Sequence, residues 1–161
     1  MAIDTSQGWV PFIKPILFFD ELYKLSRTLP YTVTKNGLIR ARISPNLEKQ
    51  MCDFYDLPLD VGFYQTPPGW SYPFHADNTR YCAFNQLLCE PNPAYICKMK
   101  FSEAILDIPY SYTTAYAINT GMEHNVSNTT TDSTRYLLNI GVDEFIPFDT
   151  VINHLKNKGL V

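Results

Sequence analysis

The segment Tyr72-Pro-Phe-His-Ala-Asp-Asn-Thr-Arg80 ends one candidate β-strand and leads into the next. His75 and Asp77 are two positions apart in it, and side chains two apart on an extended chain point to the same face. A second histidine, His124, lies in a later candidate strand. Two imidazoles and one carboxylate can hold a metal ion such as Fe(II) on one side and leave its other positions open. The sequence therefore predicts metal ligands at His75, Asp77 and His124.

The chain around this segment is a series of short apolar stretches separated by turns rich in proline, glycine and asparagine. The seven stretches predicted to be strands are residues 60–65, 72–75, 80–88, 94–101, 113–119, 123–126 and 134–142. Strands that follow one another without intervening helices favour two packed antiparallel sheets over an alternating α/β fold. The expected fold is mainly β, a jelly roll with a few peripheral helices.

Helices and a hairpin are expected at the two ends of the chain. Residues 20–29 are predicted to form a helix that Pro30 ends, and residues 31–43 a hairpin that turns at Asn36-Gly37. Two more helices are predicted, over residues 45–54 with Leu47, Met51 and Phe54 on one stripe, and over residues 149–158 with Asp149 as its cap and Val151, Ile152 and Leu155 inward. One domain is expected over residues 1–161, with a lead-in at 1–57, a β core at 58–145 and a closing helix at 146–161.

Composition narrows the classes of function. Hydrophobic residues make up 45% and charged residues 18% of the chain, which is typical of a folded globular protein. The formal net charge is −3 and no run of Lys or Arg occurs, so general nucleic-acid binding is not expected. Neither a signal peptide nor a membrane span is apparent, and a soluble, intracellular, cytoplasmic protein is expected. Four cysteines without CxxC spacing are expected to be free thiols with no role.

The order His75-x-Asp77, then His124, then Arg135 is more specific than any of its members. The interval between the last two is 135 − 124 = 11 residues. In this order and spacing the chain resembles the Fe(II)/2-oxoglutarate-dependent dioxygenases, and the sequence around the motif is similar to small prolyl-hydroxylase-like members. The resemblance covers about residues 59–142. It implies a double-stranded β-helix that carries iron at one open end.

The resemblance also implies an activity. Fe(II) would be the cofactor, 2-oxoglutarate and O2 the co-substrates, and a peptidyl side chain, amino acid or small metabolite would be hydroxylated with release of succinate and CO2. Arg135 is the candidate for the far carboxylate of 2-oxoglutarate, because a guanidinium offers a planar two-pronged partner. No catalytic residue beyond the metal ligands is expected.

Five further residues are weaker candidates. Tyr64 and Asn85 flank the motif on neighbouring strands and are candidates for contact with 2-oxoglutarate. The alternatives are a core or rim tyrosine for Tyr64 and an asparagine that caps a bulge for Asn85. Arg80, Trp70 and Tyr72 are candidates for contact with substrate; a solvated arginine and simple aromatic packing are their alternatives. Two other readings of the chain stay open: a cupin-like metal enzyme that does not use 2-oxoglutarate, and a non-catalytic β-sandwich binding module. His154, alone on the closing helix, is expected to be a surface residue.

Overall fold

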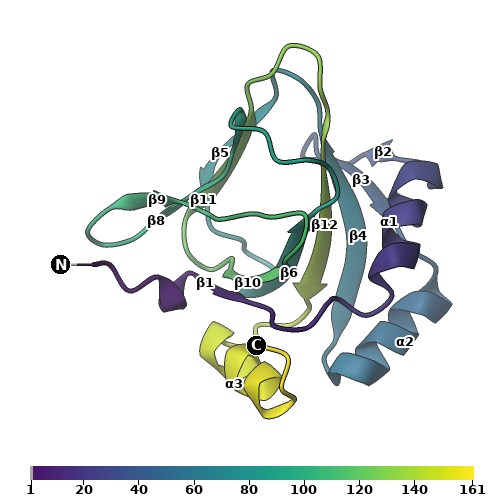
Figure 1. The fold of residues 1–161 in the computed structure, drawn as a ribbon, viewed down its shortest axis with the longest axis vertical. Coiled ribbons are helices and arrows are strands. Elements are labelled where there is room, and N and C mark those ends of the chain that lie inside the picture. The colour runs from purple at the N-terminus through teal and green to yellow at the C-terminus, as the bar shows by residue number, and fades with distance from the viewer. Residues whose placement is uncertain (1) are drawn as a thin grey trace.

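A computed structural model describes residues 2–161 as two antiparallel β-sheets with helices packed against the larger one (Figure 1). The strands are β1 Trp9–Pro11, β2 Thr32–Val33, β3 Ile39–Arg42, β4 Leu59–Thr66, β5 Ser71–His75, β6 Cys82–Leu87, β7 Tyr95–Ile96, β8 Lys98–Lys100, β9 Ile105–Asp107, β10 Tyr116–Asn119, β11 His124–Asn128 and β12 Arg135–Val142. The helices are η1 Thr5–Gln7, α1 Phe19–Thr28, α2 Pro45–Tyr55 and α3 Phe148–Asn157.

The larger sheet has the strand order β1-β10-β6-β12-β4-β3-β2, and the smaller one has the order β5-β11-β8-β9, with β7 also paired to β11. The chain alternates between the sheets in two places: β4 and β6 lie in the larger sheet with β5 in the smaller, and β10 and β12 lie in the larger sheet with β11 in the smaller. This arrangement confirms the predicted mainly β jelly roll with peripheral helices.

Strand β12 shows how the larger sheet separates its two faces. Leu138, Ile140 and Val142 belong to the apolar core that the helices cover, and all three are almost fully buried. Arg135 and Asn139, at odd positions of the same strand, point the other way and line a cavity. Because side chains alternate along a strand, one eight-residue segment supplies both the core and the cavity wall.

Helix α2 differs from the prediction in the residue that completes its apolar stripe. Ser44 caps the helix by accepting a hydrogen bond from the backbone N–H of Leu47 at 3.3 Å. Leu47, Met51 and Tyr55 are buried, whereas Phe54 is 44% exposed. The predicted inward position of Phe54 was wrong, because residues four apart on a helix share a face and 47, 51 and 55 keep that spacing.

Helix α3 begins at Phe148, with Pro147 as its N-cap and no capping side chain. The prediction that Asp149 caps the helix was therefore wrong. Its carboxylate lies in the first turn, where a negative charge interacts favourably with the positive end of the helix dipole. Val151, Ile152 and Leu155 are buried, as predicted. His154 is half-buried and its Nε2 lies 2.8 Å from the backbone oxygen of Tyr55, so it ties α3 to α2 and is not a free surface residue.

Several short elements lie outside the predicted pattern. The expected strand over residues 94–101 is divided into β7 and β8, and the expected strand at 113–119 begins only at Tyr116. β1 and β9 were not predicted, because three residues are too few to show a period. The four cysteines are free thiols, as predicted. The helices within the described chain lack the length and apolar character that a bilayer span requires.

Candidate metal centre

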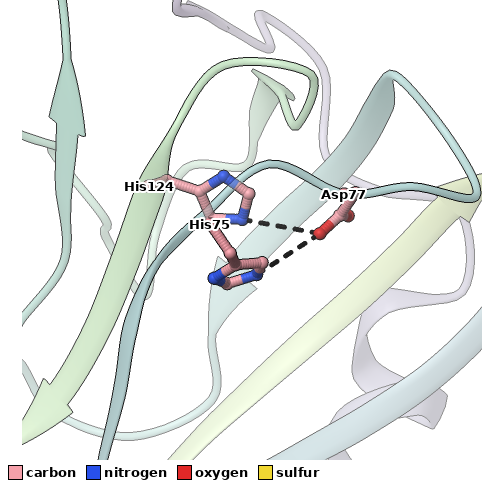
Figure 2. Close-up of side chains that lie close together, drawn as sticks. All are labelled: His75, Asp77 and His124. Carbon is pink, nitrogen blue, oxygen red and sulfur yellow. Dashed lines mark ion pairs between the residues drawn. The ribbon is translucent and has the colours of Figure 1, made fainter.

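The two histidines meet because their strands are neighbours in the smaller sheet. His75 is the last residue of β5 and His124 the first of β11, and the two are directly paired across these antiparallel strands. Their ring centroids are 4.5 Å apart. Asp77 lies two residues beyond β5, where its backbone N–H donates a hydrogen bond to the carbonyl of Thr120 at 2.8 Å. The side chains converge on one point, as Figure 2 shows.

One carboxylate oxygen of Asp77 faces both imidazoles. Its Oδ1 lies 3.4 Å from Nε2 of His75 and 3.8 Å from Nε2 of His124. The three ligand atoms all lie within 4.8 Å of one another, and they form the one cluster among residues 2–161 that is suited to a metal ion. The structure thus brings the three predicted ligands together.

The protonation of the two rings follows from their backbone contacts. Nδ1 of His75 lies 2.9 Å from the carbonyl oxygen of Pro73, and Nδ1 of His124 lies 2.8 Å from that of Met122. Because a carbonyl only accepts, each Nδ1 carries a proton and donates it, so in a neutral ring the lone pair is on Nε2. Burial, the largest influence, lowers the pKa of His124 and keeps its ring neutral.

In the neutral form of the two rings, two nitrogen lone pairs and a carboxylate oxygen face one another. Such a set of acceptors is suited to a bound cation, and a histidine that donates Nδ1–H to a carbonyl is oriented as a metal ligand usually is. Neutral imidazole with carboxylate suits Fe(II) and its divalent neighbours. The donor set present in this chain fits a mononuclear iron site.

The triad opens into a cavity of about 120 Å³. All nine residues predicted to form the site line this one cavity: Tyr64, Trp70, Tyr72, His75, Asp77, Arg80, Asn85, His124 and Arg135. They come from β4, β5, β6, β11, β12 and the loops that join them, so their proximity depends on the whole jelly roll. Their individual roles remain predictions.

Arg135 is the most unusual member of the cavity wall because its charged side chain has no charged partner among residues 2–161. The residue is only 2% exposed, and its Nε is buried with no hydrogen-bond partner. Its Nη2 lies 3.3 Å from the sulfur of Cys97, and its guanidinium carbon lies 5.3 Å from the ring centroid of Tyr110. Within residues 2–161 no carboxylate forms an ion pair with it. A buried cation of this kind is costly unless an anion neutralises it, so the position of Arg135 is suited to an anion that enters the cavity.

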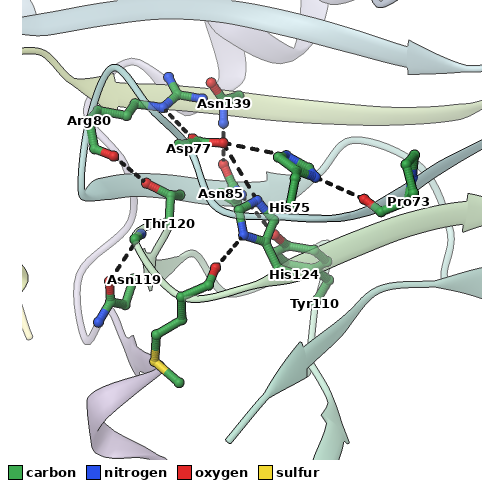
Figure 3. Close-up of polar contacts among 12 residues, drawn as sticks. Pro73, His75, Asp77, Arg80, Asn85, Tyr110, Asn119, Thr120, His124 and Asn139 are labelled. Carbon is green, nitrogen blue, oxygen red and sulfur yellow. Dashed lines mark hydrogen bonds and ion pairs between the residues drawn. The ribbon is translucent and has the colours of Figure 1, made fainter.

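Three hydrogen-bonded side chains form a chain in the cavity wall (Figure 3), and the last of them, Tyr110, lies beside Arg135. Asn139 donates from Nδ2 to Oδ1 of Asn85 at 2.7 Å, and Asn85 donates from Nδ2 to the hydroxyl of Tyr110 at 2.7 Å. Because the hydroxyl of Tyr110 accepts this bond, its own proton is free for another acceptor. Tyr110 and Asn139 were missed by sequence reasoning: Tyr110 lies in the irregular segment between β9 and β10, and no motif marks either residue.

The remaining candidates line the cavity and have contacts of their own. Trp70 and Tyr72 are stacked, with ring centroids 5.9 Å apart and planes at 15°, and Tyr72 packs edge-on against His75 at 4.5 Å. Arg80 is not a solvated side chain, since it is 15% exposed and its Nε lies 3.0 Å from Oδ2 of Asp77. Tyr64 lies with its ring 5.5 Å from the guanidinium carbon of Arg40.

Comparison with known proteins supports the fold strongly. No family model matches the sequence, and no curated protein matches it. The fold is that of the 2-oxoglutarate- and Fe(II)-dependent oxygenases, including prolyl hydroxylases.

Three solved structures illustrate the likeness. A prolyl-4-hydroxylase of Pseudomonas putida is 17% identical with a TM-score of 0.62, over 88% of this chain and 95% of its own. The viral collagen prolyl hydroxylase of Paramecium Bursaria Chlorella virus-1, in complex with 2-oxoglutarate, is 12% identical with a TM-score of 0.57, over 90% and 100%. HygX of Streptomyces hygroscopicus, with nickel and 2-oxoglutarate bound, is 12% identical with a TM-score of 0.59, over 91% and 89%. At these identities the likeness establishes the fold.

Proposed function

We propose that this protein is a non-haem oxygenase that depends on Fe(II) and 2-oxoglutarate and hydroxylates an organic substrate. One observation carries the proposal: a single cavity joins three converging metal-ligand atoms to a buried arginine that has no carboxylate partner. The first feature calls for a metal cation and the second for an anion. A small dicarboxylate that binds both the metal and Arg135 satisfies them together.

In this proposal His75, Asp77 and His124 hold the iron. When bound there, Fe(II) supplies the oxidising chemistry in which 2-oxoglutarate loses CO2 and becomes succinate, with one atom of O2 going to succinate and the other to the substrate. Arg135 binds the far carboxylate of 2-oxoglutarate, and the hydroxyl of Tyr110 donates a second hydrogen bond to it.

The rest of the cavity wall has supporting roles. Asn85 holds the Tyr110 hydroxyl in place from one side. Trp70 and Tyr72, stacked beside His75, cover the site on the substrate side and keep bulk water from it. Tyr64 lines the same cavity from β4 and completes the wall around the co-substrate.

The proposed substrate is a peptidyl side chain, an amino acid or a small metabolite. Structural neighbours of this chain have been solved with such molecules bound: a Trichoplax adhaerens prolyl hydroxylase is in complex with a peptide fragment of hypoxia inducible factor, and HygX has hygromycin B bound. Hydroxylation is preferred to halogenation because Asp77 occupies the ligand position that a halide would need.

The test is uncoupled turnover of 2-oxoglutarate, which needs no knowledge of the substrate. Purified protein is supplied with Fe(II), a reductant, O2 and 2-oxoglutarate, and succinate is measured. Succinate formation is expected for the wild type and for His154→Ala, and it should be lost in His124→Ala. Iron-dependent O2 consumption that persists without 2-oxoglutarate in Arg135→Ala would favour a cupin-like metal enzyme. A wild-type protein that binds no divalent metal would favour a binding module.

A further inference from the structure

The two oxygens of the Asp77 carboxylate have different partners, and Arg80 binds only one of them. Its Nε lies 3.0 Å from Oδ2, whereas Oδ1 is the oxygen that faces His75 and His124. Both partners are largely buried, with side chains 15% and 16% exposed. Figure 3 shows the guanidinium on the side of Asp77 away from the imidazoles. Rotation of the Asp77 carboxylate about its Cβ–Cγ bond would break the contact between Oδ2 and Arg80, so Arg80 fixes the orientation of this carboxylate.

The guanidinium of Arg80 packs against the larger sheet at a glycine, Gly141. A side chain at Gly141 on β12 would collide with the guanidinium of Arg80. The backbone of Gly141 is not left-handed, so its conformation alone does not require glycine. A glycine within a strand weakens it unless something approaches closely, and here the group that approaches is Arg80.

The backbone around Arg80 is held independently of its side chain. Thr120 accepts a hydrogen bond from the N–H of Asp77 at 2.8 Å, and its own N–H donates to the carbonyl of Tyr81 at 3.1 Å. The Thr120 hydroxyl donates to the carbonyl of Arg80 at 3.3 Å. The loop therefore has its own anchors, and removing the guanidinium is expected to leave its path intact.

We propose that Arg80 is a positioning residue of the metal centre, which holds Asp77 so that Oδ1 faces both histidines. This inference rests on the proposed function, because it assigns Arg80 to the same metal site. It is a different role from the predicted contact of Arg80 with an anionic group of the substrate, which stays a prediction, since only the Nε of the guanidinium is engaged by Asp77. Partners of metal ligands commonly change metal affinity by about 10–100-fold when they are removed.

The test measures Mn(II) affinity of the purified protein by electron paramagnetic resonance, without turnover. Arg80→Met is expected to bind Mn(II) roughly 10–100-fold more weakly than wild type. Arg80→Lys should recover part of this loss, because it restores the charge without the planar donor. Arg42→Met is the matched control: it removes a guanidinium that pairs with Asp60 outside the cavity.

Gly141→Ala provides a second and independent variant. It retains Arg80 but displaces the guanidinium, so Mn(II) binding should weaken in the same direction. The double variant of Arg80→Met and Gly141→Ala should bind no more weakly than Arg80→Met alone, because both changes remove one contact. If Arg80→Met does not fold, as judged by circular dichroism, Gly141→Ala and Arg80→Lys decide the question.

A further measurement separates positioning from general damage to the site. At saturating Mn(II), Arg80→Met should bind 2-oxoglutarate as the wild type does, whereas a damaged site would lose both ligands. Mn(II) affinity unchanged in Arg80→Met and Gly141→Ala, with normal binding by the wild type, would overturn this inference alone. A wild type that does not bind Mn(II) would overturn the proposed function together with it.

Discussion

The guanidinium of Arg135 and the ring of Tyr110 lie together in the cavity wall, with 5.3 Å between the guanidinium carbon and the ring centroid. Burial raises the pKa of Tyr110, so the hydroxyl stays protonated at neutral pH, and the bond it accepts from Asn85 leaves its proton free to donate. The pair therefore presents a cation and a neutral donor to the same small volume, which is a suitable receptor for one carboxylate.

Tyr110→Phe removes only the hydroxyl and is expected to weaken binding of 2-oxoglutarate to the Mn(II)-loaded protein. A hydrogen bond to a charged group contributes about 1.5–3 kcal/mol, so the dissociation constant should rise by roughly 10–150-fold. Isothermal titration calorimetry measures this change. Tyr95→Phe, which loses a hydroxyl bonded to Ser133, is the matched control. Equal affinities for Tyr110→Phe and wild type would remove Tyr110 from the co-substrate site.

Arg135→Met is expected to separate stability from function. The substitution removes a buried charge that has no carboxylate partner, so the free energy of unfolding of the metal-free protein should rise by about 0.5–2 kcal/mol. Binding of 2-oxoglutarate should be lost in the same variant. Urea denaturation and calorimetry measure the two properties. A clear decrease in the free energy of unfolding would mean that Arg135 stabilises the fold. It would argue against the view that Arg135 is a destabilising residue retained to bind an anion.

Metal binding should stabilise the folded protein, because the ligand set exists only when β5 and β11 are paired. Mn(II) at 100 times its dissociation constant is expected to add about 2.7 kcal/mol to the free energy of unfolding. The thermal midpoint should therefore rise by roughly 5–10 °C, and a chelator should reverse the rise. His124→Ala should show no rise. His154→Ala should show the full one from a lower starting point, since it loses its contact with Tyr55.

Tryptophan fluorescence gives a separate reading of the site. Trp70 stacks on Tyr72, which packs against His75. Trp9, in β1, packs against Phe101 instead. Binding of a paramagnetic ion such as Co(II) is therefore expected to quench the emission of Trp70 more than that of Trp9. Trp70→Phe should abolish most of the quenching and Trp9→Phe should retain it. The reverse result would show that the ion binds elsewhere.

The sequence was informative where a short motif or a regular period reports on structure. His75 and Asp77 are spaced for one face of an extended chain, and the alternation along residues 134–142 separates core from cavity. The jelly roll followed from the many short strands. The distant His124 and Arg135 were found through the order of the motif, which periodicity alone does not contain.

The sequence was silent where tertiary packing decides. Tyr110 reaches the cavity from an irregular segment, and Arg80 binds Asp77 because Gly141 on a distant strand leaves space for it. No local pattern encodes either contact. The wrong prediction of Phe54 in place of Tyr55 as the buried residue of α2 has a different cause. Both side chains are apolar enough for the buried face, and the rotation of the helix about its axis decides which of them faces the core.

The most direct test of the proposed function is an anaerobic titration of the Fe(II)-loaded protein with 2-oxoglutarate, followed by visible absorption. A 2-keto acid that chelates Fe(II) produces a weak charge-transfer band, which neither component has alone. The proposal predicts that this band appears with the wild type, saturates at one 2-oxoglutarate per iron, and is lost or needs far more co-substrate in Arg135→Ala. Tight Fe(II) binding without any such band would contradict it.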